Sequence, residues 1–272
     1  MESSLQRLLE VTAKVKQKQL TNTNEKKLAK ATSKFFRDQG SKLYDRLTTH
    51  WAISEALRLN EKDETDQVNN LFDLSTKDIN STYEEIAQRI IEDTFLVGAK
   101  DAIKMYKLGI SFDLKNPRAV AYLKNHAAQL VKELNQTTKD RIATIVTEGV
   151  DQGLSYQKIA RQIKNEFSDY AKLTTYGPKH INSRAELVAV TEIGNAYQEA
   201  NISAIRDAMD TGLEFEKYWS NTGDNKVSDG CLDNTADDWI GIDELFSSGD
   251  DRPLRFPGCR CALLMRRKGS SD

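Results

Sequence analysis

Three cysteines near the C-terminal end are the residues whose type and spacing could support chemistry. Cys231 stands alone in the sequence, whereas Cys259 and Cys261 are separated by a single residue. An odd number of cysteines argues against a disulfide framework, and in a reducing compartment clustered thiols bind metals more often than they cross-link. Structural Zn²⁺ sites prefer thiolate and imidazole ligands. We therefore predict a structural zinc site with Cys231, Cys259 and Cys261 as ligands.

The spacing of the cysteines does not select a fourth zinc ligand. Asp224, Asp229 and His180 are the candidates, and Asp224 is our first choice. A metal ion bound by ligands from separate segments would hold together the C-terminal part of the chain, which is otherwise loosely packed. The alternative is that the three cysteines are small buried apolar residues kept for packing.

Catalytic chemistry has less support, and we predict no catalytic residues. A nucleophilic cysteine needs a nearby base, but all three histidines, His50, His126 and His180, lie outside the cysteine-bearing segment. Acidic residues between positions 224 and 251 could bind Mg²⁺ or Ca²⁺, although they lack calcium-loop spacing. A metal-dependent nuclease or hydrolase that uses these Asp-rich loops is kept as an alternative.

The composition predicts a helix-rich protein. The 272 residues include 39 Lys and Arg against 41 Asp and Glu, with only 4 Pro and 14 Gly. The net charge of -2 excludes a broadly basic nucleic-acid coat. No run approaches the ~18 apolar residues of a membrane helix, and the start lacks secretory-signal features. We therefore expect a cytosolic protein with no membrane partner.

The predicted fold is mainly α, with a long helical hairpin or bundle as the body and a small C-terminal α+β appendage. Three domains are expected: an N-terminal helical arm (1–60), a helical body with long antiparallel helices (61–180) and the cysteine-bearing domain (181–272). Ser75 is the predicted start of one helix, which ends at Gly109.

The next predicted helix begins at Asn116-Pro117, a cap residue followed by proline at the first helical position. Its apolar residues, beginning with Val120 and Leu123, recur every three and four positions, which predicts one continuous rod of roughly 50 Å as far as Val150.

A glycine turn and a short amphipathic helix over residues 156–167 come next. Together with the preceding helix, they permit a helix-turn-helix interpretation, in which the short helix would read DNA through three basic residues. The preceding helix is too long for that motif and the chain is acidic. DNA binding is therefore a second alternative, and a bundle corner is the simpler interpretation.

A polar patch is predicted on the following helix, which begins with a capping box at Ser183 and Glu186 and reaches about Asp210. Helical periodicity places the patch on one face, formed by Arg184, Thr191, Glu192 and Asn195. Beyond it, alternation over residues 213–219 predicts a strand, and residues 261–265 a closing strand. The segment between them is predicted as loops, and residues 266–272 as a disordered basic tail.

These features, in this order, resemble the head morphogenesis or minor head proteins of tailed bacteriophages, typified by the F protein of phage Mu. The resemblance covers roughly residues 122–265. In that family, a helix with Arg and a Thr-Glu pair precedes a Trp-bearing strand, an Asp-x-Arg-Val loop and a His-Pro-x-Cys-Arg-Cys ending. The matching residues here are Arg184, Thr191, Glu192, Trp219, Asp224, Cys231, Pro257, Cys259, Arg260 and Cys261. Two positions depart from the pattern, because Phe256 replaces the usual His and Ser228 replaces a Cys found in many members.

The resemblance implies a non-enzymatic virion component that is assembled in the bacterial cytoplasm. It would sit at the portal vertex or inner capsid surface and act in procapsid assembly, with effects on DNA packaging or ejection. The expected partners are the portal protein, the major capsid protein, or both, and packaged DNA through the basic tail. We further expect the appendage to fold against the polar patch, with Arg260 paired to Glu192 or a loop carboxylate.

Overall fold

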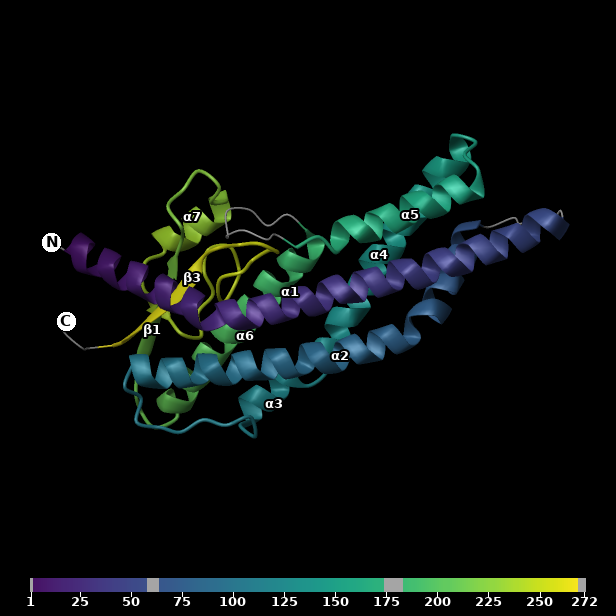
Figure 1. Cartoon of the computed structure of the whole chain (residues 1–272). Coiled ribbons are helices and arrows are strands. Elements are labelled where there is room, and N and C mark those ends of the chain that lie inside the picture. Colours follow the sequence, from purple (N-terminus) through teal and green to yellow (C-terminus); the bar gives the residue numbers. More distant parts are fainter. Residues whose placement is uncertain (1, 58–63, 174–182, 269–272) are drawn as a thin grey trace. The chain divides into compact units, whose positions relative to one another are not determined.

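The computed structural model describes residues 2–57, 64–173 and 183–268 and confirms a mainly α fold with a small C-terminal sheet (Figure 1). The elements are α1 (Glu2–Leu57), α2 (Glu64–Met105), α3 (Pro117–Leu123), α4 (His126–Asp151), α5 (Tyr156–Tyr170), α6 (Arg184–Met209), β1 (Phe215–Ser220), α7 (Asp229–Ala236), β2 (Ile240–Gly241) and β3 (Ala262–Arg267). Within these described residues, no helix is long and apolar enough to span a membrane.

The chain divides into two compact units. The sheet unit comprises Met1–Lys27, Ile90–Lys124 and Val188–Asp272, and the helical unit comprises Leu28–Arg89 and Asn125–Leu187. Each unit gathers segments that are distant in sequence. Consequently α1, α2 and α6 each contribute residues to both units.

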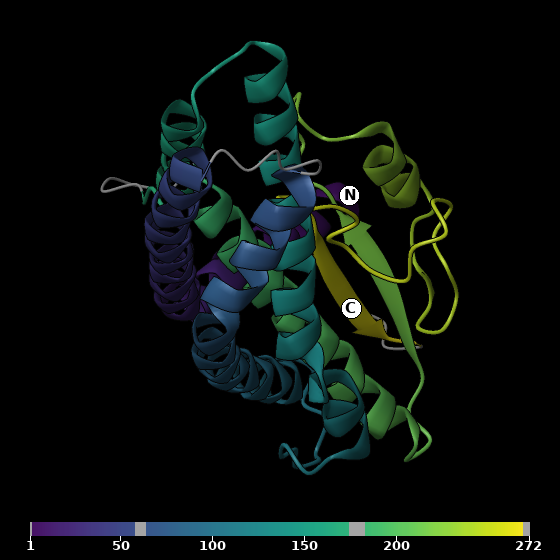
Figure 2. The same cartoon turned by 90° about the vertical axis from the view of Figure 1, so that its right-hand side faces the viewer.

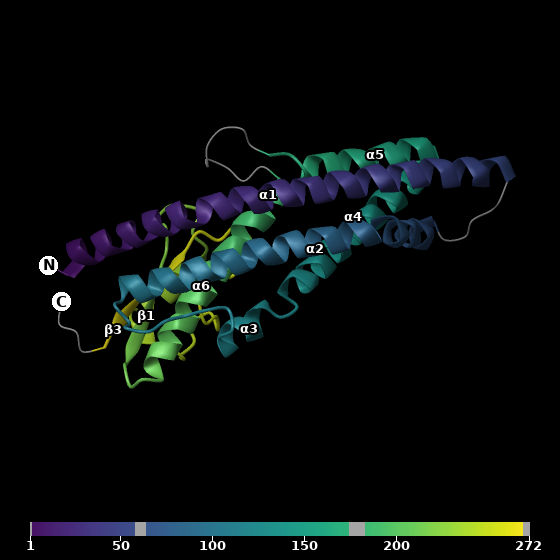
Figure 3. The ribbon, with the colours of Figure 1, turned by 60° about the horizontal axis from the view of Figure 1, so that its bottom comes forward.

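In the helical unit, α1 and α2 form a long antiparallel hairpin (Figure 3). The hydroxyl oxygens of Thr32 and Tyr83 lie 2.8 Å apart, and further along Gln39 Nε2 donates to Asn80 Oδ1 at 3.2 Å. From the first contact to the second, the residue number rises on α1 and falls on α2, so the two helices run antiparallel. Aromatic side chains fill the core of this unit because they bury large apolar areas, among them Phe36, Phe72 and Phe167.

The two helices α4 and α5 meet at a tight corner, as the simpler interpretation of this region predicts. A Cβ placed on Gly149 would lie 2.6 Å from Ile159 Cγ1, so only glycine permits the two helices to approach this closely. Gly153 has a φ of +64°, which glycine adopts without strain and which reverses the chain here.

The predicted rod from Asn116 to Val150 is wrong, because the helix breaks between α3 and α4. Lys124 is extended and Asn125 is left-handed at φ 66°, a conformation that asparagine tolerates better than most residues. Val120, placed by periodicity in the seam, is 47% exposed. The cap at Asn116 is confirmed, since its side chain accepts from Arg118 N at 2.8 Å.

The predicted helix start at Ser75 is also wrong. Ser75 lies inside α2, which begins at Glu64, and its hydroxyl donates to the carbonyl of Leu71 one turn earlier. Serine is common at caps but can satisfy its hydroxyl within a helix in this way. The cap pattern alone therefore gave a false boundary.

The sheet unit holds an antiparallel sheet with strand order β2-β1-β3. Along β1 and β3, Glu216 faces Arg266 and Trp219 faces Leu263. Figure 2 shows the two longer strands side by side, with α6 on one side of the sheet and α7 on the other. Both predicted strands are confirmed, whereas α7 and β2 lie in the segment predicted as loops.

The beginning of the predicted basic tail belongs to the sheet. Arg266 and Arg267 are the last residues of β3, and Arg266 pairs with Glu216 at 2.9 Å across the ladder and lies over the Trp239 ring. Opposite charges on facing strands stabilise the pairing. The prediction of a disordered tail is therefore wrong for residues 266 and 267.

Candidate functional site

A tight turn presents Cys259 to the sheet unit. Cys259 N donates to Phe256 O at 3.0 Å, and the two central residues are Pro257 and Gly258, which has a φ of +81°. Proline followed by a glycine with positive φ is the signature of a type II turn. Gly258 N also donates to Thr191 Oγ1 at 3.2 Å, which anchors the turn to α6.

This anchoring predicts a measurable cost for Gly258→Ala. The side chain would be forced into the left-handed region, at a cost of about 1–2 kcal/mol in the free energy of unfolding. Gly258→Asn should cost less, because asparagine tolerates that conformation. Urea denaturation of the full-length variants measures both values, and equal losses for the two would contradict the turn assignment.

The three predicted cysteine ligands come together. The sulfur atoms of Cys231, from α7, and of Cys259 and Cys261, from the segment entering β3, all lie within 4.8 Å of one another. The Cys231 and Cys259 sulfurs are 4.0 Å apart, and all three thiols are free and buried. Two segments almost thirty residues apart in the chain therefore meet at a sulfur-lined point.

Hydrogen bonding within the cluster separates the proton affinities of two thiols. The pKa of Cys259 is lowered because the Cys261 side chain donates to its sulfur, helped by the backbone N–H of Cys261. The pKa of Cys261 is raised because it holds that shared proton and is buried. One thiolate is therefore stabilised in this environment, which is the protonation state that metal binding requires.

Asp224, the predicted fourth ligand, does not join the sulfur cluster. Its two carboxylate oxygens accept from Arg260 Nη1 and Nη2 at 2.6 and 2.8 Å. This ion pair is the loop carboxylate pairing expected for Arg260, and it lowers the pKa of Asp224 to about 2. Among the other candidates, Asp229 is exposed on α7, and His180 lies outside the described residues.

The predicted polar patch on α6 does not act as one surface. Thr191 contacts the cysteine-bearing turn in the sheet unit, whereas Arg184 makes its contacts in the helical unit. Glu192 and Asn195 are half-buried, and the charge of Glu192 adds to the effect of burial in raising the pKa of Tyr122. The expected docking of the appendage is thus observed at Thr191, but Arg184 has a different role.

Trp219, another predicted motif residue, is the largest fully buried side chain among the residues that the structure describes. It lies on β1 and meets the Phe246 ring edge-on, with ring centroids 5.2 Å apart. Its neighbour across the ladder is Leu263, two residues after Cys261. Trp219 therefore forms the apolar support on which the cysteine-bearing segment rests.

Several contacts that hold the site were not predicted. Gln198 Nε2 on α6 donates to the carbonyl of Cys261 at 3.4 Å. Asn234, fully buried on α7, donates to Ser248 Oγ at 2.8 Å and accepts from Ser248 N at 2.9 Å. Amide side chains bind distant backbone groups in this way only after folding, so no local sequence pattern could have identified them.

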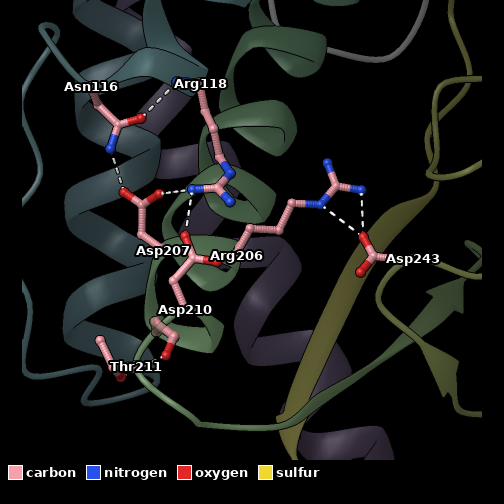
Figure 4. Close-up of polar contacts among 8 residues, drawn as sticks. Asn116, Arg118, Arg206, Asp207, Asp210, Thr211 and Asp243 are labelled. Carbon is pink, nitrogen blue, oxygen red and sulfur yellow. Dashed lines mark hydrogen bonds and ion pairs between the residues drawn. The ribbon is translucent and has the colours of Figure 1, made fainter.

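A second set of polar contacts fixes the other end of α6 (Figure 4). Arg118 Nη1 forms ion pairs with Asp207 and with Asp210, the latter at 3.0 Å, and the Asn116 side chain donates to Asp207. Arg206 Nη2 pairs with Asp243 at 3.0 Å. These charges attach α3 and the loop after β2 to α6, so their role is to position elements.

Lys217 is fully buried on β1 and gives a prediction for pH dependence. Its Nζ donates to Asp251 O at 2.8 Å, and burial lowers its pKa to about 8. An unfolded chain with an ordinary lysine pKa binds more protons between about pH 8 and pH 10, so the free energy of unfolding should rise with pH there. Allowing for solvent screening, we expect a gain of about 1–2 kcal/mol.

The measurement is chemical denaturation of the wild type and Lys217→Met across this pH range. The difference in unfolding free energy between the two proteins should change by about 1–2 kcal/mol. Only the wild-type protein has a buried lysine, and its deprotonation at higher pH removes the free-energy cost of burying the charge. Cysteine and tyrosine titration is common to both proteins and cancels in the difference. A difference that is constant with pH would contradict the buried ammonium.

Residues 140–264 match the family described as Phage Mu protein F like protein, from within α4 to within β3. The match confirms the predicted resemblance and supports a role in phage head morphogenesis. No curated protein and no solved structure matches the chain.

The cysteine cluster is the candidate metal site that the described residues provide. Among the described residues, the three cysteines are the only group of three or more His, Cys, Asp and Glu side chains close enough together to share a metal ion. Neither His50 nor His126 belongs to that group. The site therefore offers sulfur ligands and buried support.

Proposed function

We propose that this protein is a non-enzymatic minor head protein of a tailed phage. The observation that carries the proposal is the family match over residues 140–264, which includes the cysteine-bearing segment and the strand that supports it. The buried cluster, the type II turn and the Trp219 support are structural features, in keeping with a component that is built into a particle.

The proposed place of action is the portal vertex or the inner surface of the capsid, during assembly of the head in the bacterial cytoplasm. The partners would be the portal protein, the major capsid protein, or both. The long helices α1 and α2 supply extended surface for such contacts, and their exposed side chains are of mixed charge. Effects on DNA packaging or ejection would follow from the position at the portal.

A pull-down with tagged full-length protein tests this proposal. The portal and major capsid proteins encoded beside it would be co-expressed, and we expect at least one of them to be retained after washing. Trp219→Ala serves as the variant with a disturbed sheet unit, and Trp239→Ala, whose ring packs against Tyr218 and Arg266 of the same sheet, as a matched control. Retention of neither partner by the wild-type protein would contradict the proposal.

Contact with packaged DNA through the C-terminal basic residues is a weaker part of the proposal, because Arg266 and Lys268 already pair with Glu216 and Glu214. Binding of the full-length protein to duplex DNA, measured against salt concentration, tests it. A DNA contact requires affinity that falls as salt rises. Affinity that does not change with salt would remove DNA from the set of partners.

A further inference from the structure

The cysteine cluster has the size that one zinc ion needs. Three thiolates around a tetrahedral Zn²⁺, with Zn–S bonds near 2.3 Å, have their sulfurs roughly 3.8 Å apart. The observed sulfurs lie within 4.8 Å of one another, and one pair is 4.0 Å apart. Binding would therefore draw the three side chains inward by well under the length of a bond, without moving either backbone segment far.

A fourth position is suggested by Ser228, the N-cap residue of α7. Its hydroxyl oxygen is buried, makes no hydrogen bond and does not cap the helix. It precedes Cys231 by three residues, the same separation as in the Cys-x-x-Cys pairs that hold one zinc ion. Burial of a hydroxyl without a partner costs free energy. Coordination of the metal by the Ser228 oxygen, or a hydrogen bond from it to a bound water, would offset that cost.

Charge is also compensated at this point. Three thiolates and one Zn²⁺ leave one net negative charge, and a nearby cation stabilises a buried anion. The guanidinium of Arg255 lies against the backbone next to Cys231, since a Cβ placed on Gly230 would be 2.0 Å from Arg255 Nη1. Asp250 holds this guanidinium in place through an ion pair of 2.5 Å, which offsets part of its charge.

We propose that Cys231, Cys259 and Cys261 bind one Zn²⁺ as thiolates, and that residue 228 occupies the fourth coordination position in place of the predicted Asp224. The ion links α7 to the segment that enters β3 and so stabilises the sheet unit. This inference depends on the sulfur geometry and on Ser228. It stands or falls independently of the proposed role in head assembly.

The test uses the full-length protein, prepared under reducing conditions, stripped with a chelator and titrated with Zn²⁺ and Co²⁺. We expect one equivalent of metal to bind. The cobalt form should show a thiolate-to-metal charge-transfer band and the visible bands of tetrahedral cobalt. Zinc should also raise the melting temperature, because it binds the folded state. Competition with a coloured chelator gives the affinity.

Matched variants separate the ligands. Cys259→Ser should weaken zinc binding at least a hundredfold, and Asp224→Ala should leave it unchanged, because Asp224 is paired with Arg260. Ser228→Cys should tighten zinc binding at least tenfold by supplying a fourth thiolate. This last variant adds a ligand to an intact core, so it remains informative even if removal of a cysteine prevents folding.

Three results would overturn the inference. The first is a reduced wild-type protein that binds no stoichiometric zinc. The second is a cobalt form without the thiolate charge-transfer band. The third is a Ser228→Cys protein with unchanged zinc affinity, which would remove residue 228 from the coordination position.

Discussion

Replacing Trp219 with alanine should lower the free energy of unfolding by about 3–5 kcal/mol. The indole is completely buried, meets the Phe246 ring edge-on, and lies opposite Leu263 on β3, the strand that Cys261 leads into. Its removal leaves a cavity in a small sheet that has few other large side chains to fill it. Since domains are stable by only about 5–15 kcal/mol, this loss is a large share of the total.

Urea denaturation measures this loss, and hydrogen exchange of the native protein locates it. Protection should fall in the sheet unit, which holds β1, β3 and α7, because opening of local structure reports local stability. Trp239→Ala is the control, since Trp239 is partly exposed and lies against Arg266 at the edge of the sheet. We expect it to cost about 1 kcal/mol. Similar losses for the two tryptophans would show that Trp219 is not the support of the sheet.

Replacing Arg184 with alanine should cost the helical unit about 2–3 kcal/mol. The guanidinium donates to Thr138 Oγ1 at 2.9 Å and to Leu134 O at 3.1 Å, both on α4. It also lies over the rings of Phe36 and Tyr170, at 5.2 and 4.9 Å from their centroids. Burial lowers the pKa of this arginine, so its charge is tolerated only because these contacts compensate for lost hydration.

Arg184→Lys distinguishes the shape of this group from its charge. Lysine keeps the positive charge but cannot make two parallel hydrogen bonds or stack as a plane, so we expect most of the loss to remain. Arg206→Ala is the control: the exposed pair with Asp243 should contribute at most about 1 kcal/mol. Full stability in the lysine variant would mean that charge alone matters. Hydrogen exchange should place the loss of protection in α4 and α5 and leave β1 and β3 unchanged.

Local patterns identified several elements correctly. The cap at Asn116 and the helix start at Ser183 depend on nearest neighbours, and the structure contains both: Arg118 N donates to the Asn116 side chain and Glu186 N donates to Ser183 Oγ. Both long strands were also identified, β1 from the alternating residues over 213–219 and β3 as a closing strand over 261–265, and the structure contains both. These features need no knowledge of distant contacts.

The errors have one physical cause, which is that a local pattern is compatible with more than one tertiary context. A continuous apolar seam suggested a rod, but Asn125 breaks it and Arg118 attaches the short helix α3 to α6. Ser75 resembled a cap but satisfies its hydroxyl inside α2. The short helix α7 was missed because its eight residues carry a weak pattern, and distant groups such as Ser248 hold it in place.

The sequence by itself determined the helical class, the two long strands, the cysteine-rich ending and the resemblance to the phage Mu F-like family. These properties depend on composition, periodicity and short motifs. Only the tertiary structure decided which predicted site residues act together. It gathered the three cysteines, paired Asp224 with Arg260 away from them, and placed Arg184 against α4. The reason is that residues tens of positions apart are brought together by the burial of apolar surface on folding, which no short motif encodes.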